Sequence, residues 1–474
     1  MPISQTKGII WSAIERFSAQ GIQFILSIII ARLISPSDYG LIAMLTIFLA
    51  IAQSIIDSGF SNALIQKKDR TNIDFSTVFY FNFFISILVY IIFWGCAPYI
   101  ATFYNEPLLI EVTRYAGLNL IISSISIVQR TQLTIELNFK IQAKITLISV
   151  TLGGILGIYL AFVGYGVWAL VTQSLLTNLL TTILLCFFAH WKPLLIFSYK
   201  SFKELFTFGS RILLTGLLAT IYNNLYSLII GKYFNAYSLG YYNRMNTIAS
   251  FPSSNITTII ARVVYPIQCS MQNDDEKLKN SFYKLLKVTS FIIFPLMLGL
   301  AALAHPLVYV LLSAKWLEAA PLLTIICFAL MWNHIMFLNW QLLAVKGRSD
   351  LSFKSEIYKK VISIIILFVT IPLGIKAMCI GLVCYSLFDM IIIIYFLRPI
   401  LSIKYKDEFR LLMPIFLLAV SMFGIIQISI NYIPNYYIKL AVGIIIGSLY
   451  YISMACLLKI EALQYILNKL KKQL

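Results

Sequence analysis

Fourteen apolar stretches of helix length fill this chain almost from end to end. A helix of about 20 apolar residues crosses a hydrocarbon core of about 30 Å. Lipid offers no hydrogen bonds to a backbone, so a segment that crosses it as one apolar run must be helical. The sequence therefore predicts an all-α integral membrane protein with about fourteen crossings, at residues 8–34, 38–59, 76–98, 108–129, 145–163, 166–189, 207–231, 238–266, 288–311, 318–345, 361–375, 377–397, 411–430 and 436–458.

The distribution of basic residues indicates how the chain is oriented in the membrane. The net charge of +18 could suggest a nucleic-acid partner, but most lysines and arginines gather at the termini and in alternate loops. The opposite loops hold only four lysines, Lys232, Lys315, Lys376 and Lys439. The positive-inside rule then places both termini in the cytoplasm, as an even number of crossings also requires. We expect a multi-pass membrane protein, with membrane lipid rather than nucleic acid as its surroundings.

The sequence offers little for catalysis. The seven cysteines are scattered, and none forms a metal-like pair. No hydrolase, kinase or dinucleotide motif is present, and every predicted outer loop is short. We therefore expect no enzyme activity, no metal and no cofactor, apart from a possible coupling proton or sodium ion.

An internal repeat links two distant turns. The segment at 27–40 aligns without gaps on the segment at 227–240, an offset of 200 residues, and Gly40 falls on Gly240. In both copies one helix ends, a short turn follows, and the next helix begins. An even number of crossings separates the copies, so the two halves share one orientation. Parallel repeats of this kind indicate a transporter whose site lies between two bundles.

Several motifs together resemble one family. They are Leu-Ile-Ser-Pro-Ser-Asp-Tyr-Gly at 33–40, Asp-Ser-Gly-Phe-Ser-Asn-Ala at 57–63, Gly-Tyr-Gly-Val-Trp-Ala-Leu at 164–170, Leu-Gly-Tyr-Tyr-Asn-Arg at 239–244 and Phe-Pro-Leu-Met-Leu-Gly at 294–299. Nearly the whole chain resembles Wzx-type polysaccharide flippases of the multidrug/oligosaccharidyl-lipid/polysaccharide exporter superfamily, in particular the colanic-acid and teichuronic-acid exporter branch.

The resemblance implies a fold and a cargo. It implies two pseudo-symmetric six-helix bundles plus two extra helices. We accordingly expect an N-terminal bundle at 1–190, a cytoplasmic linker at 191–206, a C-terminal bundle at 207–400, and the extra helices with a basic amphipathic tail at 401–474. It also implies a flippase that exports undecaprenyl-pyrophosphate-linked repeat units for polysaccharide or lipopolysaccharide biosynthesis. Its partners would be the lipid-linked oligosaccharide, polysaccharide polymerase and assembly proteins.

Arginines inside the predicted spans are the candidate headgroup site. An inner tier and an outer tier would suit a pyrophosphate held at one leaflet and released at the other, because guanidinium fits phosphate oxygens in pairs. The alternative is that these side chains snorkel to the interface, which long basic side chains do readily. The inner tier is Arg16, Arg211 and Arg262, and the outer tier is Arg32, Arg114 and Arg244.

Other residues could complete a transport site. Tyr222, Asn223 and Tyr226 are predicted to line a cavity and contact sugar rings, although aromatic residues also form belts at the membrane boundary. Pro252 would bend its helix as a hinge for alternating access, or would serve only a packing kink.

Asp389 and Asp57 are candidates for a coupling-ion site, and Asp57 near a helix end could instead pair with a basic residue.

Two other functions remain open at this point. A cation-coupled multidrug antiporter of the same superfamily would share the fold, but the surplus of arginine within the spans favours an anionic cargo. A polysaccharide polymerase or ligase would carry a large outer loop, which this sequence lacks.

Overall fold

The computed structural model describes residues 20–189 and 191–465, without the side chains at 256 and 258–263. Within these residues every regular element is a helix. Ten helical segments of the described chain are long and apolar enough to cross a membrane, and the first helix, Gln20–Leu33, is apolar but shorter. The prediction of an all-α integral membrane protein is confirmed, and the number of fourteen crossings stays a prediction.

The chain divides into two compact units, Met1–Gly240 and Tyr241–Leu474. In the first unit, α4 packs along α5 and α6 packs along α7, while α8 lies against α2, α3 and α4. The helices of this unit that follow the first helix are α2 (Pro36–Asp57), α3 (Phe60–Gln66), α4 (Asn72–Tyr104), α5 (Leu109–Ile135), α6 (Phe139–Val163), α7 (Val167–Phe188) and α8 (Tyr199–Tyr233).

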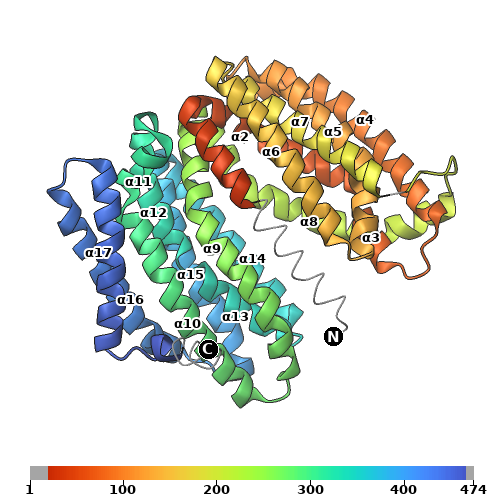
Figure 1. Ribbon diagram of the computed structural model, residues 1–474. Coiled ribbons are helices and arrows are strands. Elements are labelled where there is room, and N and C mark those ends of the chain that lie inside the picture. Colours follow the sequence, from red (N-terminus) through yellow and green to blue (C-terminus); the bar gives the residue numbers. More distant parts are fainter. Residues whose placement is uncertain (1–19, 190, 466–474) are drawn as a thin grey trace. The chain divides into compact units, whose positions relative to one another are not determined.

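In the second unit, α10 packs along α16, α16 packs along α17, and α15 lies against α12 and α14 (Figure 1). Helix α9 (Ala236–Ser270) begins in the first unit and continues into the second. The others are α10 (Asp275–Ala302), α11 (Ala304–Leu312), η1 (Ala314–Ala319), α12 (Ala320–Leu330), α13 (Asn333–Val345), α14 (Ser349–Thr370), η2 (Ile371–Leu373), α15 (Ile375–Leu401), α16 (Tyr405–Asn431) and α17 (Tyr436–Leu457).

Short polar motifs start several helices. At α2, the Ser35 hydroxyl accepts a hydrogen bond from the Asp38 amide at 3.2 Å, and the Asp38 carboxylate accepts one from the Ser35 amide at 3.2 Å. Thr71 and Asp74 form the same reciprocal motif at α4. Such caps satisfy amide groups that have no partner in a first helical turn.

Polar contacts between helices hold the interior of the first unit together. Asn178 on α7 donates to the side-chain oxygen of Asn119 on α5 at 2.6 Å. Ser123 on α5 donates to Gln53 on α2 at 2.9 Å. In lipid the hydrophobic effect contributes little to helix association, so side-chain hydrogen bonds and close packing carry more of it. These contacts therefore fix α2, α5 and α7 around one polar seam.

The two repeat copies contact each other. A Cβ atom at Gly40 would lie 1.7 Å from the Ala236 carbonyl oxygen, and one at Gly240 would lie 1.9 Å from the Pro36 carbonyl oxygen. Pro36 and Ala236 are themselves equivalent positions of the repeat, so the contact is reciprocal. The first turns of α2 and α9 thus approach so closely that only glycine fits at 40 and 240.

The repeat extends to the caps of these helices. Asn235 accepts from the Ser238 amide at 2.8 Å, as Ser35 accepts from the Asp38 amide. The predicted repeat is therefore present in local structure as well as in sequence.

Some predicted connections are largely helical. The stretch at 267–287 holds the end of α9 and the start of α10, where Asp274 accepts from the Lys277 amide at 3.0 Å. Helix α14 begins at Ser349, inside the polar stretch at 346–360, and α8 begins at Tyr199, inside the predicted linker. Hydropathy detects only the apolar part of a helix, and a capped polar end extends it beyond that part.

Candidate functional site

The predicted headgroup arginines have different surroundings. Arg32, at the end of the first helix, and Arg211, on α8, are exposed, whereas Arg244 on α9 is only 3% exposed. Burying a guanidinium is costly, so Arg244 is the described arginine whose position most needs an explanation. Arg16 and the side chain of Arg262 lie outside the described part of the chain.

Arg114 on α5 is half-buried and lies against an aromatic ring. Its guanidinium carbon is 4.6 Å from the ring centroid of Trp94 on α4. No described carboxylate lies within ion-pair distance of Arg114. A cation held by a ring rather than by an acid keeps its charge available to an anion.

The predicted cavity and hinge residues lie on α8 and α9. Tyr222 and Tyr226 are half-buried, and Asn223 is exposed. Pro252 is half-buried in the middle of α9, where its ring nitrogen cannot donate to the Ile248 carbonyl. The helix nevertheless continues through it to Ser270.

Asp57 ends α2 and contacts the start of α3. The hydroxyl and the amide of Ser61 both donate to its carboxylate. Asp57 is half-buried, and a carboxylate is favourable at a helix N-terminus. This contact gives Asp57 a local structural partner.

Asp389 on α15 forms an ion pair that joins two helices. The Lys359 ammonium on α14 lies 2.8 Å from the Asp389 carboxylate and 3.2 Å from Glu356, and the Lys359 side chain is only 4% exposed. Lys360 lies 3.7 Å from Glu356, so two lysines and two carboxylates form one cluster. The sequence indicated Asp389 by its depth, but Lys359 was missed because its partner lies on the neighbouring helix.

This cluster borders a cavity of about 640 Å³ between α13, α14 and α15. Glu356, Lys359 and Asp389 line it together with Trp340 and Phe353. A buried lysine between two carboxylates is an internal cation at a site that could otherwise take a sodium ion or a proton. In the structure, the Lys359 ammonium is the cation next to the Asp389 carboxylate.

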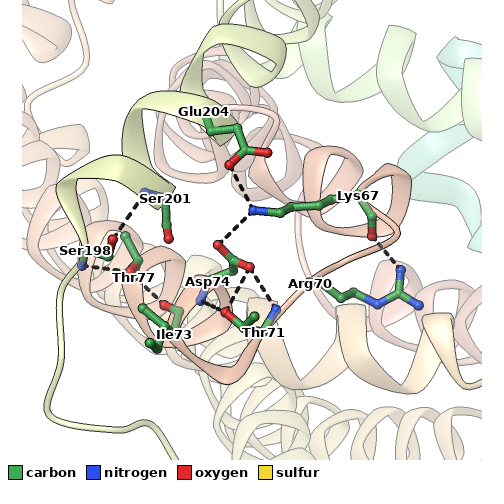
Figure 2. Close-up of polar contacts among 9 residues, drawn as sticks. All are labelled: Lys67, Arg70, Thr71, Ile73, Asp74, Thr77, Ser198, Ser201 and Glu204. Atoms are coloured by element: carbon green, nitrogen blue, oxygen red, sulfur yellow. Dashed lines mark hydrogen bonds and ion pairs between the residues drawn. The ribbon is translucent and has the colours of Figure 1, made fainter.

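A second charged network joins the start of α4 to α8. Figure 2 shows the Lys67 ammonium between two carboxylates, 3.1 Å from Asp74 and 3.0 Å from Glu204. Burial alone lowers the pKa of Lys67, but hydrogen bonds to Glu204 and Asp74 outweigh it, so the pKa lies above its ordinary value. The Ser198 amide also donates to the Thr77 hydroxyl at 3.1 Å.

These contacts hold the segment before α8 against α4. The pairing of Lys67 with Glu204, more than a hundred residues away, could not be predicted from the sequence.

An apolar groove of about 400 Å³ lies between α10, α16 and α17. We call it the α17 groove, and its lining includes Leu296 on α10, Ile426 on α16, and Gly443 and Ser448 on α17. Tyr451 on α17 donates to the Phe291 carbonyl at 3.0 Å and fixes α17 against α10. A Cβ at Gly443 would lie 2.4 Å from a Leu303 methyl group, so the glycine lets α17 approach closely.

The α17 groove was missed at the sequence level, because periodicity does not reveal which helices leave space between them. Its apolar lining could hold a hydrocarbon chain.

Comparisons with known proteins agree with this fold. A family model described as "Polysaccharide biosynthesis protein" matches residues 29–321, more than half of the chain. The teichuronic acid biosynthesis protein TuaB of Bacillus subtilis is 25% identical over 93% of each chain. The lipopolysaccharide biosynthesis protein WzxC of Escherichia coli is 27% identical over 74% of this chain and 71% of its own length.

Solved structures share the fold. The lipid II flippase MurJ, in an inward closed conformation, matches with a TM-score of 0.76 at 14% identity, over 95% of this chain and 98% of its own. An inward-facing multidrug transporter of the MATE family matches with a TM-score of 0.60 at 15% identity, over 82% of this chain and 98% of its own. The chain therefore belongs to the polysaccharide biosynthesis protein family, which confirms the Wzx-type resemblance of its sequence motifs.

Proposed function

We propose that this protein is a flippase that moves undecaprenyl-pyrophosphate-linked polysaccharide repeat units from the inner to the outer leaflet of the bacterial cytoplasmic membrane. The α17 groove is the observation that carries the proposal, because a membrane-level apolar groove is suited to the hydrocarbon tail of a lipid-linked cargo. WzxC and TuaB are named for lipopolysaccharide and teichuronic acid biosynthesis, and the succinoglycan biosynthesis transport protein ExoT is a further relative.

The headgroup would be held by the arginines. We propose that Arg114, Arg244, Arg32 and Arg211, with Arg16 and Arg262, bind the pyrophosphate along its path, and that Tyr222, Asn223 and Tyr226 contact the sugars. Arg114 and Arg244 support this best, because one is stacked on a ring without a described acid and the other is buried. A cationic-drug antiporter would gain nothing from such side chains.

The cycle would be alternating access between an N-terminal bundle at 1–190 and a C-terminal bundle at 207–400, joined by the linker at 191–206 and followed by the extra helices, with Pro252 as a hinge. We further propose that both termini are cytoplasmic and that the exported glycan passes to a polymerase and assembly proteins. Moving one negative charge outward against a negative interior gains about 2.3 kcal/mol per 100 mV, so the potential itself can drive a pyrophosphate.

A coupling ion would add to this drive. We propose Asp389 as its site, with a proton or sodium ion taking the place of the Lys359 ammonium during the cycle. Asp57 is the second candidate, although Ser61 already occupies its carboxylate.

The test fills the α17 groove. Ser448→Trp places a large ring in the groove, whereas Leu449→Trp, at a neighbouring position that is 63% exposed, leaves the groove open and serves as the matched control. In a deletion host, we expect Ser448→Trp to lower surface polysaccharide about tenfold, equivalent to about 1.4 kcal/mol. Undecaprenyl-linked repeat units should accumulate facing the cytoplasm.

Normal export by a correctly inserted Ser448→Trp protein would contradict the role of the groove. Sensitivity of the deletion host to cationic drugs, with no accumulated lipid-linked glycan, would favour the antiporter instead.

A further inference from the structure

A second apolar groove lies in the first unit, between α2, α4 and α8. Its volume is about 690 Å³, larger than that of the α17 groove. We call it the α4 groove, and its lining includes Ile51, Ile55, Ile92, Cys96, Phe103 and Leu228. None of the described residues that line it is charged, so its walls suit a hydrocarbon chain.

A lysine lies at the end of this groove. The Lys232 ammonium donates to the Phe103 carbonyl oxygen at 2.6 Å and lies 4.5 Å from the centroid of the Phe103 ring. Phe103 lines the groove one residue before α4 ends, and Leu228 lies one turn before Lys232 on the same face of α8. The cation therefore marks the end of the groove at which α4 ends.

Lys232 remains available to an anion. Its side chain is exposed, and none of the described carboxylates lies within ion-pair distance of it. An ammonium has three donors, and the Phe103 carbonyl accepts one of them. The other two N–H groups can therefore donate to phosphate oxygens while the hydrogen bond to the Phe103 carbonyl is kept.

An apolar groove that ends at an available ammonium matches a lipid with a phosphate headgroup and one long tail. We propose that the α4 groove binds the polyprenyl phosphate end of the carrier lipid at the end of α4, with the tail along α4 and the phosphate on Lys232. Lys67, at the opposite end of the first unit's α4–α8 contact, is already paired with two carboxylates and offers no comparable site.

This inference rests on the proposed function for the identity of the lipid. It adds to that function a second tail site, in a different unit from the α17 groove and on the side of the membrane that we expect to be external. A zwitterionic phospholipid fits less well, because its own ammonium competes with Lys232 for its phosphate.

The test measures binding rather than export. The full chain is placed in phosphatidylcholine nanodiscs with a polyprenyl monophosphate that carries a diazirine on its tail, and crosslinked peptides are located by mass spectrometry. We expect crosslinks on α4 between Ile92 and Phe103. Lys232→Gln should lower their yield at least fivefold, and Lys232→Arg should restore it.

The control is Lys439→Gln, which removes another lysine that lies over an aromatic ring, 5.7 Å from the centroid of Tyr436, but in the second unit. It should leave the yield on α4 unchanged. As a variant that does not alter charge, Ile55→Trp narrows the groove and should also lower the yield.

Three results would overturn the inference. The first is a lack of crosslinks on α4, and the second is a Lys232→Gln yield equal to that of the unaltered protein. The third is displacement of the probe by phosphatidylglycerol as readily as by unlabelled polyprenyl monophosphate. Failure of the proposed function would appear differently, as normal glycan export in Ser448→Trp cells while the nanodisc crosslinks on α4 persist.

Discussion

The ion pair between Lys359 and Asp389 joins two charges that would each be costly alone among membrane helices. Glu356 shares the same ammonium, so the cluster is balanced only while all its members are present. An ion pair of this kind contributes little net stability compared with a well-packed apolar pair, but loss of one partner leaves an uncompensated buried charge. Loss of the Lys359 ammonium would therefore leave the ionised Asp389 carboxylate destabilised.

Single and double substitutions at this pair should therefore differ. We expect Lys359→Met to destabilise the protein by about 3–5 kcal/mol, because it leaves the Asp389 carboxylate without its cation. The double variant Lys359→Met with Asp389→Leu should recover most of this loss. Thermal unfolding in detergent, followed by fluorescence-detected size exclusion, measures both.

The control for this pair is Lys360→Met. Lys360 is on the same helix and lies 3.7 Å from Glu356, but its side chain is 37% exposed and that of Lys359 only 4%, so its loss should cost less. Equal melting of the single and double variants would show that the two side chains are independent.

At the scale of single residues, the sequence indicated which side chains to consider but not their partners. The depth of Asp389 in its apolar run made it a candidate, and the position of Arg114 inside a predicted crossing made it one. Lys359 and Trp94, their contacts, come from other helices, and no spacing along one helix predicts which neighbour a side chain meets. Asp57 lies at a helix end, as expected, but the partner that its carboxylate meets there is Ser61 and not a predicted basic residue.

The helices themselves were predicted well where they are apolar and poorly where they are polar. The crossing predicted at 436–458 corresponds to α17 (Tyr436–Leu457) almost residue for residue. The crossing predicted at 288–311 is interrupted at Leu303, between α10 and α11, and α10 begins at Asp275. Polar first turns are stabilised by caps rather than by lipid, so hydropathy underestimates the length of these helices.

The close approach of α2 and α9 leads to a prediction at this scale. Gly40→Ala and Gly240→Ala each place a Cβ less than 2 Å from a backbone oxygen, so the helices must move apart. We expect each substitution to cost about 1–3 kcal/mol, the usual range for overpacking. The melting temperature in detergent and glycan export should both fall.

Gly216→Ala on α8 is the matched control. No atom lies within 4 Å of a Cβ built at Gly216, so this substitution in a helix should be neutral or stabilising. If Gly40→Ala and Gly216→Ala melted at the same temperature, the contact between the repeat copies would be looser than the structure indicates.

For the whole molecule, composition was sufficient to predict the class of fold. A mean hydropathy of +0.86 over 474 residues is typical of an integral membrane protein, and the internal repeat indicated two related halves. The grooves could not be predicted, because each depends on the spacing of three helices, one of which lies far from the other two in sequence. The number of crossings depends on how short or polar helices are counted, and composition alone does not decide this.

The orientation of the molecule gives a further prediction. Tyr432, between α16 and α17, is 86% exposed, and Lys404, between α15 and α16, is also exposed. In a background without native cysteines, a membrane-impermeant maleimide added to intact cells should label Tyr432→Cys and not Lys404→Cys. The expectation follows from the basic residues near Lys404, which favour the cytoplasmic side.

Permeabilised cells provide the control, because both cysteines should then react. Labelling of Lys404→Cys alone in intact cells would mean that the protein has the opposite orientation.

The reciprocal contact between Gly40 and Gly240 has a consequence for the origin of this fold. Each repeat copy contacts the other through the same surface, which is how two identical subunits of a symmetric dimer would meet. A half-length ancestor could have associated with a second copy of itself through this turn before duplication and fusion placed both on one polypeptide. Co-expression of the two halves as separate chains should then reconstitute a complex, and Gly40→Leu in one of them should weaken their association.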